Sequence, residues 1–228
     1  MNFEIDTEQL ERALGTMWNV KNDVISFSST LKDNPTTKRG IMSTTCSLFD
    51  LIGFLAPFIV IPKLLLQELW RLGYDWDSPV DGPLLCKWLK WLEGVKRVSE
   101  VQLDRCYNLS DQQVSEIQLH VFSDASEKAY GAVAYLRFCF KTGGYHVSFV
   151  LAKSKVAPLK TVSLARLELC AGVAGVRLYR TIVHEIDLPI ERICFWSDSQ
   201  LTLQYINNKS QRLRVFFANR TADILQHT

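Results

Sequence analysis

The chain has 228 residues, of which 47% are hydrophobic and 22% are charged. This composition excludes a disordered or low-complexity protein and supplies enough apolar residues for one large core or two smaller ones. The net charge is +2 overall. Residues 1–115 carry 12 Lys and Arg against 15 Asp and Glu (−3), whereas residues 116–228 carry 14 against 9 (+5). The second half therefore attracts anions, which is compatible with nucleic acid as a partner.

In the first half, the pattern predicts a β-hairpin followed by helices. Residues 13–27 contain two short apolar stretches separated by the turn-forming residues 21–23. After a polar link, residues 43–73 are apolar at helical spacing, and we expect two helices broken near Pro57. A tryptophan-rich helix is expected over residues 83–98.

From residue 118 onward, the pattern predicts an α/β domain. Three strands joined by turns form an antiparallel meander, and a long helix, a fourth strand and two helices follow. The expected ranges are 119–123, 129–140, 145–152, 163–186, 193–197, 200–207 and 214–226. The helical crossover predicts a mixed sheet in which the fourth strand runs parallel to the first. The polar stretch before residue 116 suggests two domains, 1–115 and 116–228.

Two further features bear on the environment of the protein. The apolar run at residues 51–62 is shorter than the about 20 residues of a spanning helix, so we expect a core segment and no membrane partner. No C-x-x-C spacing occurs, and we expect reduced, buried thiols in an intracellular, cytoplasmic protein rather than a zinc site or a disulfide framework. The cysteines are Cys46, Cys86, Cys106, Cys139, Cys170 and Cys194.

Three acidic residues form a pattern, since two follow expected strands and one lies on the helix between them. Asp124 lies in the phrase F-S-D-A-S, and Asp198 in the similar phrase W-S-D-S-Q. Glu168 is the one charged residue on the helical stripe expected to face the sheet, which consists of Leu164, Glu168, Ala171, Gly175, Leu178 and Ile182. If the first and fourth strands are parallel neighbours, their carboxyl ends bring the aspartates together, and the helix places Glu168 over them. Three oxygen donors without a nearby His or Cys favour Mg²⁺ or Mn²⁺.

Each of these acids also has a simpler structural interpretation. An Asp after a strand is often a turn residue, and Asp198 precedes an expected helix, where it would suit an N-cap. Glu168 would then pair with Arg166 or with a lysine of the sheet. The combination of all three acids in one βαβ frame favours the metal site. Because the phosphate-binding patterns G-x-G-x-x-G and G-x-x-x-x-G-K are absent, we expect no small-molecule cofactor.

Longer phrases surround the three acids and extend over nearly the whole chain. They are L-G-T-M-W-N-V-K-N-D (Leu14 to Asp23), T-K-R-G-I-M-S (Thr37 to Ser43), F-D-L-I-G-F-L-A-P (Phe49 to Pro57), L-H-V-F-S-D-A-S-E-K-A-Y-G-A-V-A-Y (Leu119 to Tyr135), L-A-K-S-K-V-A-P-L-K (Leu151 to Lys160), A-R-L-E-L-C-A-G (Ala165 to Gly172), F-W-S-D-S-Q (Phe195 to Gln200) and F-F-A-N-R (Phe216 to Arg220). From Leu119 on, they strongly resemble the ribonuclease H region of BEL/Pao-type retrotransposon pol polyproteins, a region also catalogued as a Pao retrotransposon peptidase. The earlier phrases resemble the stretch between the reverse-transcriptase palm and ribonuclease H.

The resemblance implies a ribonuclease H-like mixed sheet preceded by a mainly helical thumb- or connection-like segment. It also implies that Asp124, Glu168 and Asp198 are three of four acids that bind two metal ions and cleave the RNA strand of RNA–DNA hybrids. The fourth acid of the family follows another strand in an Asn-Pro-Ala-Asp-like phrase. Asn219 to Asp223 imitates that phrase inside an expected helix, so we do not assign Asp223 to the site. We therefore expect a domain that lacks its final strand and helix and cleaves poorly.

Five polar residues are candidates for contacts with the hybrid, although each also suits an ordinary surface role. They are Ser126, Lys153, Lys155, Arg166 and Gln200. Two other functions stay open. An integrase- or transposase-like nuclease usually has its helical Glu after both aspartates, and a non-catalytic remnant that binds nucleic acid or protein would explain the missing fourth acid. An aspartic peptidase is not supported, because no Asp-Thr or Asp-Ser pair is followed by Gly.

Overall fold

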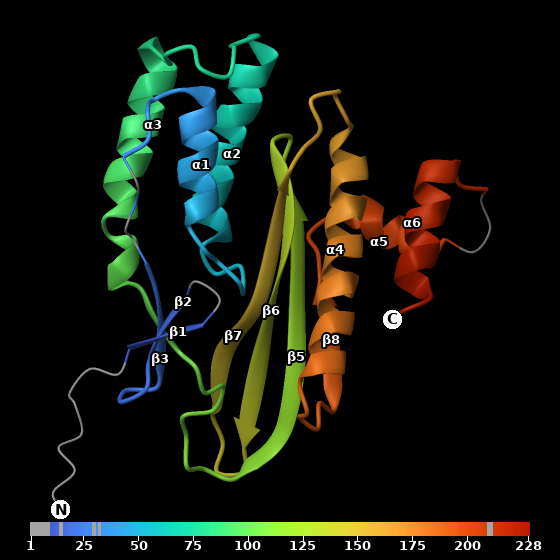
Figure 1. The fold of residues 1–228 in the computed structure, drawn as a ribbon. Helices are drawn as coiled ribbons and strands as arrows, with labels where there is room; N and C mark the ends of the chain where they lie inside the picture. The colour runs from blue at the N-terminus through green and yellow to red at the C-terminus, as the bar shows by residue number, and fades with distance from the viewer. Residues whose placement is uncertain (1–9, 14–15, 29–30, 32, 209–211) are drawn as a thin grey trace, which may run out of the picture. The chain divides into compact units, whose positions relative to one another are not determined.

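Figure 1 shows the computed structural model of the chain. The structure describes residues 10–13, 16–28, 31, 33–208 and 212–228. The chain divides into two compact units. Unit 1 comprises residues 1–51 and 61–106, and unit 2 comprises residues 52–60 and 107–228.

Unit 1 contains a small antiparallel sheet and helices. The strands pair in the order β1 (Leu10–Ala13), β2 (Thr16–Asn19), β3 (Val24–Phe27) and β4 (Gln102–Asp104). The helices are α1 (Lys38–Ser47), α2 (Ala56–Arg71), α3 (Gly82–Val95) and the 3₁₀ turn η1 (Val98–Glu100), although residues 56–60 of α2 belong to unit 2. The predicted hairpin is confirmed as β2 and β3, and Trp18 Nε1 donates to Asp23 Oδ1 across its turn at 3.0 Å.

The prediction of a helix break near Pro57 was wrong in position. Helix α2 begins at Ala56, so Pro57 lies in its first turn, where the missing N–H has no helical acceptor to lose. The break is the segment between Ser47 and Ala56. Helix α1 begins at Lys38, inside the stretch expected to be a polar link, because Thr37 caps it by accepting a hydrogen bond from the Gly40 N–H at 3.1 Å.

Unit 2 has the predicted mixed sheet with the order β7-β6-β5-β8, in which β5 and β8 are parallel and the other neighbours are antiparallel. Its strands are β5 (Val114–Ala125), β6 (Ala129–Phe140), β7 (Tyr145–Val156) and β8 (Arg192–Trp196). Its helices are α4 (Leu164–Glu185), α5 (Gln200–Asn207) and α6 (Val215–Leu225). Strands β5 and β7 are longer than the sequence predicted.

Helix α4 covers one face of this sheet, and α6 packs against α4 (Figure 1). A Cβ atom added to Gly175 would lie 3.2 Å from Val121 Cγ1 and 3.7 Å from Ala132 Cβ. The backbone of α4 therefore approaches β5 and β6 closely. Buried side chains of the sheet and of Ile182 form the main core, and a smaller cluster of Leu169, Val173, Val176 and Ile224 joins α4 to α6.

The six cysteines are less buried than the sequence predicted. All six cysteines are free, but the expectation that they are buried was wrong, because three are exposed and three are partly exposed. Cys46 and Cys86, for example, lie on outward faces of α1 and α3.

Among the residues that the structure describes, no helix has the length and hydropathy needed to cross a membrane.

A segment before α2 is tied to the edge of the unit 2 sheet. The N–H of Ala152 in β7 donates to the carbonyl oxygen of Ile52 at 2.8 Å, and the rings of Phe54 and Phe149 meet edge to face at 5.1 Å. Gly53 has φ +78°, and a Cβ atom there would lie 1.9 Å from the carbonyl oxygen of Ala152. Only glycine allows this contact, which explains the glycine in the phrase F-D-L-I-G-F-L-A-P.

Substituting Gly53 should therefore destabilise unit 2. We expect Gly53→Ala to lower the free energy of unfolding by about 2–5 kcal/mol, since backbone strain and the clash with β7 add together. Urea denaturation followed by circular dichroism measures this difference. Gly143→Ala is the matched control, because Gly143 has φ +87° with nothing within 4 Å, and it should cost only about 1–2 kcal/mol. Equal effects would contradict the proposed contact.

Candidate metal centre

The register of two parallel strands brings the two aspartates together. Phe122 of β5 is paired with Trp196 of β8. Asp124 lies two residues after Phe122, and Asp198 lies two residues after Trp196. Because parallel strands end at the same edge of a sheet, the two phrases F-S-D-A-S and W-S-D-S-Q occupy equivalent positions.

Glu168 approaches the same edge from the second turn of α4. Its residue is 8% exposed, while Ala171, Leu178 and Ile182 on the same stripe are also buried. The predicted orientation of this stripe is confirmed except for Leu164, which is 46% exposed at the start of the helix. The carboxylate is therefore held against the sheet by the hydrophobic packing of its own helix.

The three carboxylates converge as expected. One oxygen atom from each of Asp124, Glu168 and Asp198 can be chosen so that all three lie within 4.8 Å of one another. Glu168 is buried, whereas both aspartates are exposed. The cluster is thus an acidic site that is buried on the side of Glu168 and open to solvent on the side of the two aspartates.

The surroundings of Glu168 make its ionised form unfavourable. Burial, together with the negative charges of Asp124 and Asp198, raises the pKa of Glu168 to about 7. Among the described residues, no hydrogen-bond donor reaches the buried Oε2 of Glu168. A buried carboxylate oxygen without a donor is costly, so the geometry calls for a cation or a proton.

The residues present fit a hard divalent cation. All three donors are carboxylate oxygens, and neither His nor Cys belongs to the cluster. Mg²⁺ and Mn²⁺ prefer such oxygen ligands, and a cation at this position would favour the ionised form of Glu168. The assignment of metal ligands stays a prediction, but the arrangement of side chains that it requires is present.

The alternative role of Asp198 as a helix cap does not apply. Ser199 is the N-cap of α5, because its Oγ accepts a hydrogen bond from the Thr202 N–H at 3.2 Å. Asp124 Oδ1 accepts a hydrogen bond from the N–H of the next residue, Ala125, at 2.6 Å. The side chain of Asp198 is therefore available to the acidic cluster.

The expected substrate residues have different surroundings. Ser126 closes the turn between β5 and β6, where its Oγ donates to the carbonyl oxygen of Ala129 at 3.1 Å. Lys153 and Lys155 lie exposed on β7, and Gln200 is exposed at the start of α5. The guanidinium of Arg166 lies 5.0 Å from the ring centre of Phe216 in α6. Contacts of these five residues with a substrate stay predictions.

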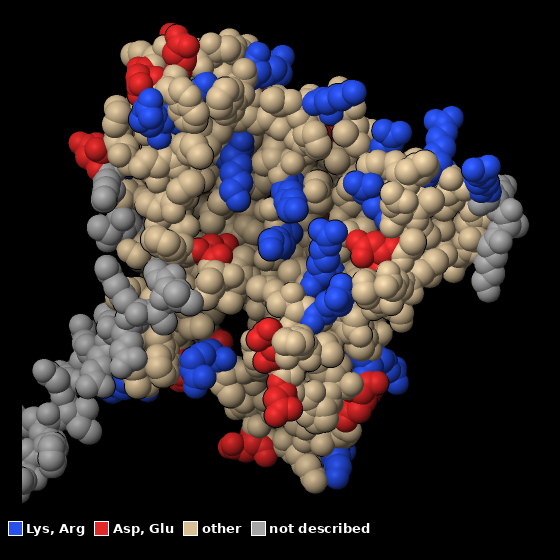
Figure 2. All heavy atoms as spheres, turned by 45° about the vertical axis from the view of Figure 1, so that its right-hand side comes forward, with Lys and Arg blue, Asp and Glu red and all other residues tan. Residues whose placement is uncertain are grey.

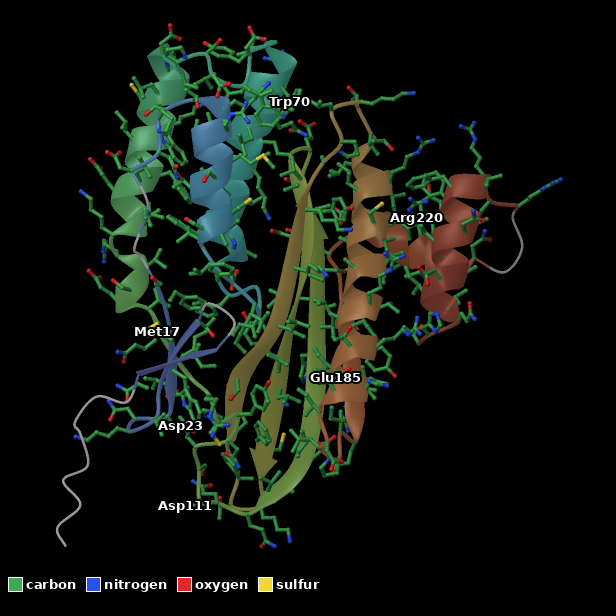
Figure 3. The ribbon with its side chains drawn as sticks, in the orientation of Figure 1. Met17, Asp23, Trp70, Asp111, Glu185 and Arg220 are labelled. Carbon is green, nitrogen blue, oxygen red and sulfur yellow. The ribbon has the colours of Figure 1, made fainter. Side chains whose placement is uncertain are left out.

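Asp223 was not assigned to the predicted site, and in the structure it lies outside the cluster. It belongs to α6 and faces Arg177, with an N–O distance of 3.4 Å. In the same helix, Arg220 points toward α4, and its Nε donates to Cys170 Sγ at 3.3 Å (Figure 3). Helix α6 is therefore bound to α4 by polar contacts that do not include the three acids.

Basic residues accompany the acidic cluster in unit 2. Figure 2 shows Lys and Arg side chains on the side of the chain that carries α4 and α6. This distribution agrees with the net charge of +5 for residues 116–228, where 14 basic residues outnumber 9 acidic ones. Such a surface attracts polyanions even though the metal cluster itself is negative.

One further pair of residues near the cluster, Trp196 and His120, was not predicted to belong to the site. Trp196 Nε1 donates to His120 Nδ1 at 3.0 Å, beside the paired strand ends that carry the aspartates. The strand register supplies the signal that would have found them, since His120 precedes Asp124 by four residues and Trp196 precedes Asp198 by two.

A comparison with a solved structure supports the fold. The structure is similar to a foamy viral protease-reverse transcriptase, termed dRH, in complex with double-stranded DNA, with a TM-score of 0.50 and 14% identity. The match covers 95% of this chain but only 36% of the foamy viral chain, so this chain spans about a third of that protein. A match to ribonuclease H1 from the archaeon Halobacterium salinarum covers 49% of this chain and 76% of that one, with 10% identity and a TM-score of 0.31.

Sequence comparison identifies the family. No curated protein matches the chain. The family model described as the Pao retrotransposon-like RNaseH-like domain matches residues 37–199, which include Asp124, Glu168 and Asp198. This match spans more than half of the 228 residues. The chain therefore belongs to the Pao retrotransposon-like, RNase H-like domain family.

Proposed function

We propose that unit 2 hydrolyses the RNA strand of RNA–DNA hybrids with the help of Mg²⁺ or Mn²⁺, as part of a retroelement pol polyprotein. The observation that carries this proposal is the convergence of Asp124, Glu168 and Asp198 within 4.8 Å at one edge of an RNase H-like sheet. The same proposal assigns residues 1–115 to a thumb- or connection-like segment and residues 116–228 to the ribonuclease H-like domain.

The three acids have distinct parts in this proposal. Glu168 is the buried ligand that forms the base of the site, and its position is fixed by α4. Asp124 and Asp198 are exposed ligands that face the solvent from which the substrate arrives. When bound, divalent cations lower the pKa of a water molecule and stabilise the charge that develops on the leaving oxygen.

The surface of unit 2 suits a polyanionic substrate. Lys153 and Lys155 are exposed on β7 and are available for contacts with phosphate groups. Contacts with 2′-hydroxyl groups would distinguish the RNA strand from DNA, and the candidates are Ser126 and Gln200, each two residues after an aspartate of the cluster. The order Asp, Glu, Asp along the chain favours this function over an integrase-like nuclease.

A cleavage assay tests the proposed reaction. We expect the chain to cut the RNA strand of a labelled hybrid slowly and only with Mg²⁺ or Mn²⁺, and to leave double-stranded DNA intact. Loss of residues that merely orient metal ligands already costs about 10–100-fold, so Glu168→Gln should reduce cleavage by about 100-fold or more. Asp223→Asn is the matched control and should retain activity, because Asp223 contacts Arg177 and not the cluster.

Two results would contradict the proposed reaction. Hybrid cleavage that survives Asp124→Asn combined with Glu168→Gln would show that another site cuts. A folded chain that binds hybrids and Mn²⁺ without cutting at any protein concentration would instead support the non-catalytic binding module.

The raised pKa of Glu168 also predicts how the metal-free protein responds to pH. The pKa is about 7 in the folded chain and 4.5 as the ordinary value, so the folded state holds a proton that the unfolded state releases between these pH values. The free energy of unfolding should therefore fall as the pH rises from about 4.5 to about 7, and this contribution should be absent in Glu168→Gln.

Thermal or urea unfolding of both proteins in EDTA, at pH 5 and pH 8, measures this effect. The stability of Glu168→Gln relative to the wild type should be greater at pH 8 than at pH 5, and Mg²⁺ should reverse the difference at pH 8. A difference between the two proteins that does not change with pH would show that Glu168 is ionised normally without metal.

A further inference from the structure

Three aromatic rings are stacked on the face of the unit 2 sheet that points away from α4. The ring of Trp196 lies 6.0 Å from His120 at an angle of 16° and 5.9 Å from Phe122 at an angle of 11°. Val121 and Ser123 face Gly175 of α4, so the alternate residues His120 and Phe122 of β5 face the opposite side. The single tryptophan of β8 thus contacts two rings of β5.

A hydrogen bond fixes the chemical form of His120. The indole N–H of Trp196 can only donate, so His120 Nδ1, at 3.0 Å, must accept and carry no proton. The neutral ring then carries its proton on Nε2, which donates to Gln118 Oε1 at 3.0 Å. Burial and the charges of Arg137 and Arg192 lower the pKa of His120, which favours this neutral form.

The network continues into the sheet and anchors the histidine. Gln118 is 4% exposed. Its Oε1 also accepts from Arg137 Nη1 at 3.0 Å, and its Nε2 donates to Glu116 Oε2 at 2.8 Å. Because Gln118 is held from both ends, His120 presents a fixed acceptor to Trp196.

An ion pair between Arg192 Nε and Glu116 Oε1, at 3.1 Å, links β8 to β5 at the end opposite Trp196. Strand β8 has five residues and pairs only with β5 among the described strands, and four of the five are exposed. A parallel ladder repeats along the strand, so main-chain hydrogen bonds alone do not distinguish one register from another. Ser123 Oγ donates to the carbonyl oxygen of Trp196 at 3.4 Å, a long contact. The indole is therefore the link between side chains of β8 and β5 that lies nearest the aspartates.

We propose that Trp196 and His120 form a register lock that holds Asp198 beside Asp124. Both are positioning residues, since neither belongs to the acidic cluster. A shift of β8 along β5 would move Asp198 away from Asp124 and Glu168. The role in metal binding rests on the proposed function, whereas the role in strand register is independent of it.

Substitutions that keep the rings but remove the hydrogen bond test the lock. In Trp196→Phe and His120→Phe, we expect the main-chain amides of residues 192–196 to exchange with deuterium at least about 5-fold faster, as loss of one hydrogen bond predicts. Mn²⁺ affinity at pH 7.5 should fall about 10-fold, the lower end of the range for residues that orient metal ligands. His146→Phe, the same substitution on β7, is the control and should change neither quantity.

A double variant separates positioning from general damage. In Trp196→Phe combined with His120→Phe, both polar partners are replaced by rings, so part of the lost protection should return.

Histidine ¹⁵N chemical shifts of the wild type should show the tautomer protonated on Nε2.

Each result has a defined meaning. Unchanged exchange of residues 192–196 in Trp196→Phe, or a wild-type His120 protonated on Nδ1, would overturn the lock. Faster exchange in a protein that never binds Mn²⁺ would retain the lock and overturn the proposed metal site. Faster exchange with unchanged Mn²⁺ affinity would overturn the positioning of Asp198.

Discussion

The parallel pairing of β8 with β5 is the constraint on which the arrangement of the acids depends. It places Phe122 beside Trp196. Asp124 follows Phe122 and Asp198 follows Trp196 by the same number of positions. The crossover through α4 makes this pairing parallel, and the same helix carries Glu168. One topological feature therefore determines the positions of all three carboxylates.

The stability of this arrangement is limited by charge. A carboxylate that is 8% exposed and lies beside two others would be costly without a counterion, as the raised pKa of Glu168 shows. The hydrophobic packing of α4 holds Glu168 in place despite this cost, because Ala171, Leu178 and Ile182 on the same stripe are buried in the core. A site built in this way is poorly stabilised when empty and gains stability from a bound cation.

Much of unit 2 could be predicted because its elements have strong periodic patterns. The sequence located α5 at residues 200–207 and the strand at 129–140, and the parallel neighbour of β5 followed from the crossover. Strand β5 was expected to begin at residue 119, because Glu116 and Gln118 look unsuited to a strand until the hydrogen bond from Arg137 of β6 to Gln118 and the ion pair of Arg192 of β8 with Glu116 are known. Those contacts depend on the register of the neighbouring strands.

Unit 1 was less predictable for a related reason. The start of α1 was missed because Lys38 looks like a linker residue, yet it is buried, with its Nζ 3.7 Å from the ring centre of Trp70. Strand β4 pairs with β3, about 75 residues earlier in the chain. It has only three residues, of which two are polar, and so short a polar segment gives no local signal of a strand. In both cases a tertiary contact, rather than local preference, determines the element.

The proposed function requires Asp124, Glu168 and Asp198 to bind a divalent cation together. The most direct measurement is an anomalous difference map from crystals of this chain grown with Mn²⁺ near pH 7.5. We expect a manganese peak coordinated by oxygen atoms of all three side chains, and the loss of this peak in Glu168→Gln. A map with no peak between these carboxylates, or a peak that persists in the variant, would contradict this proposal.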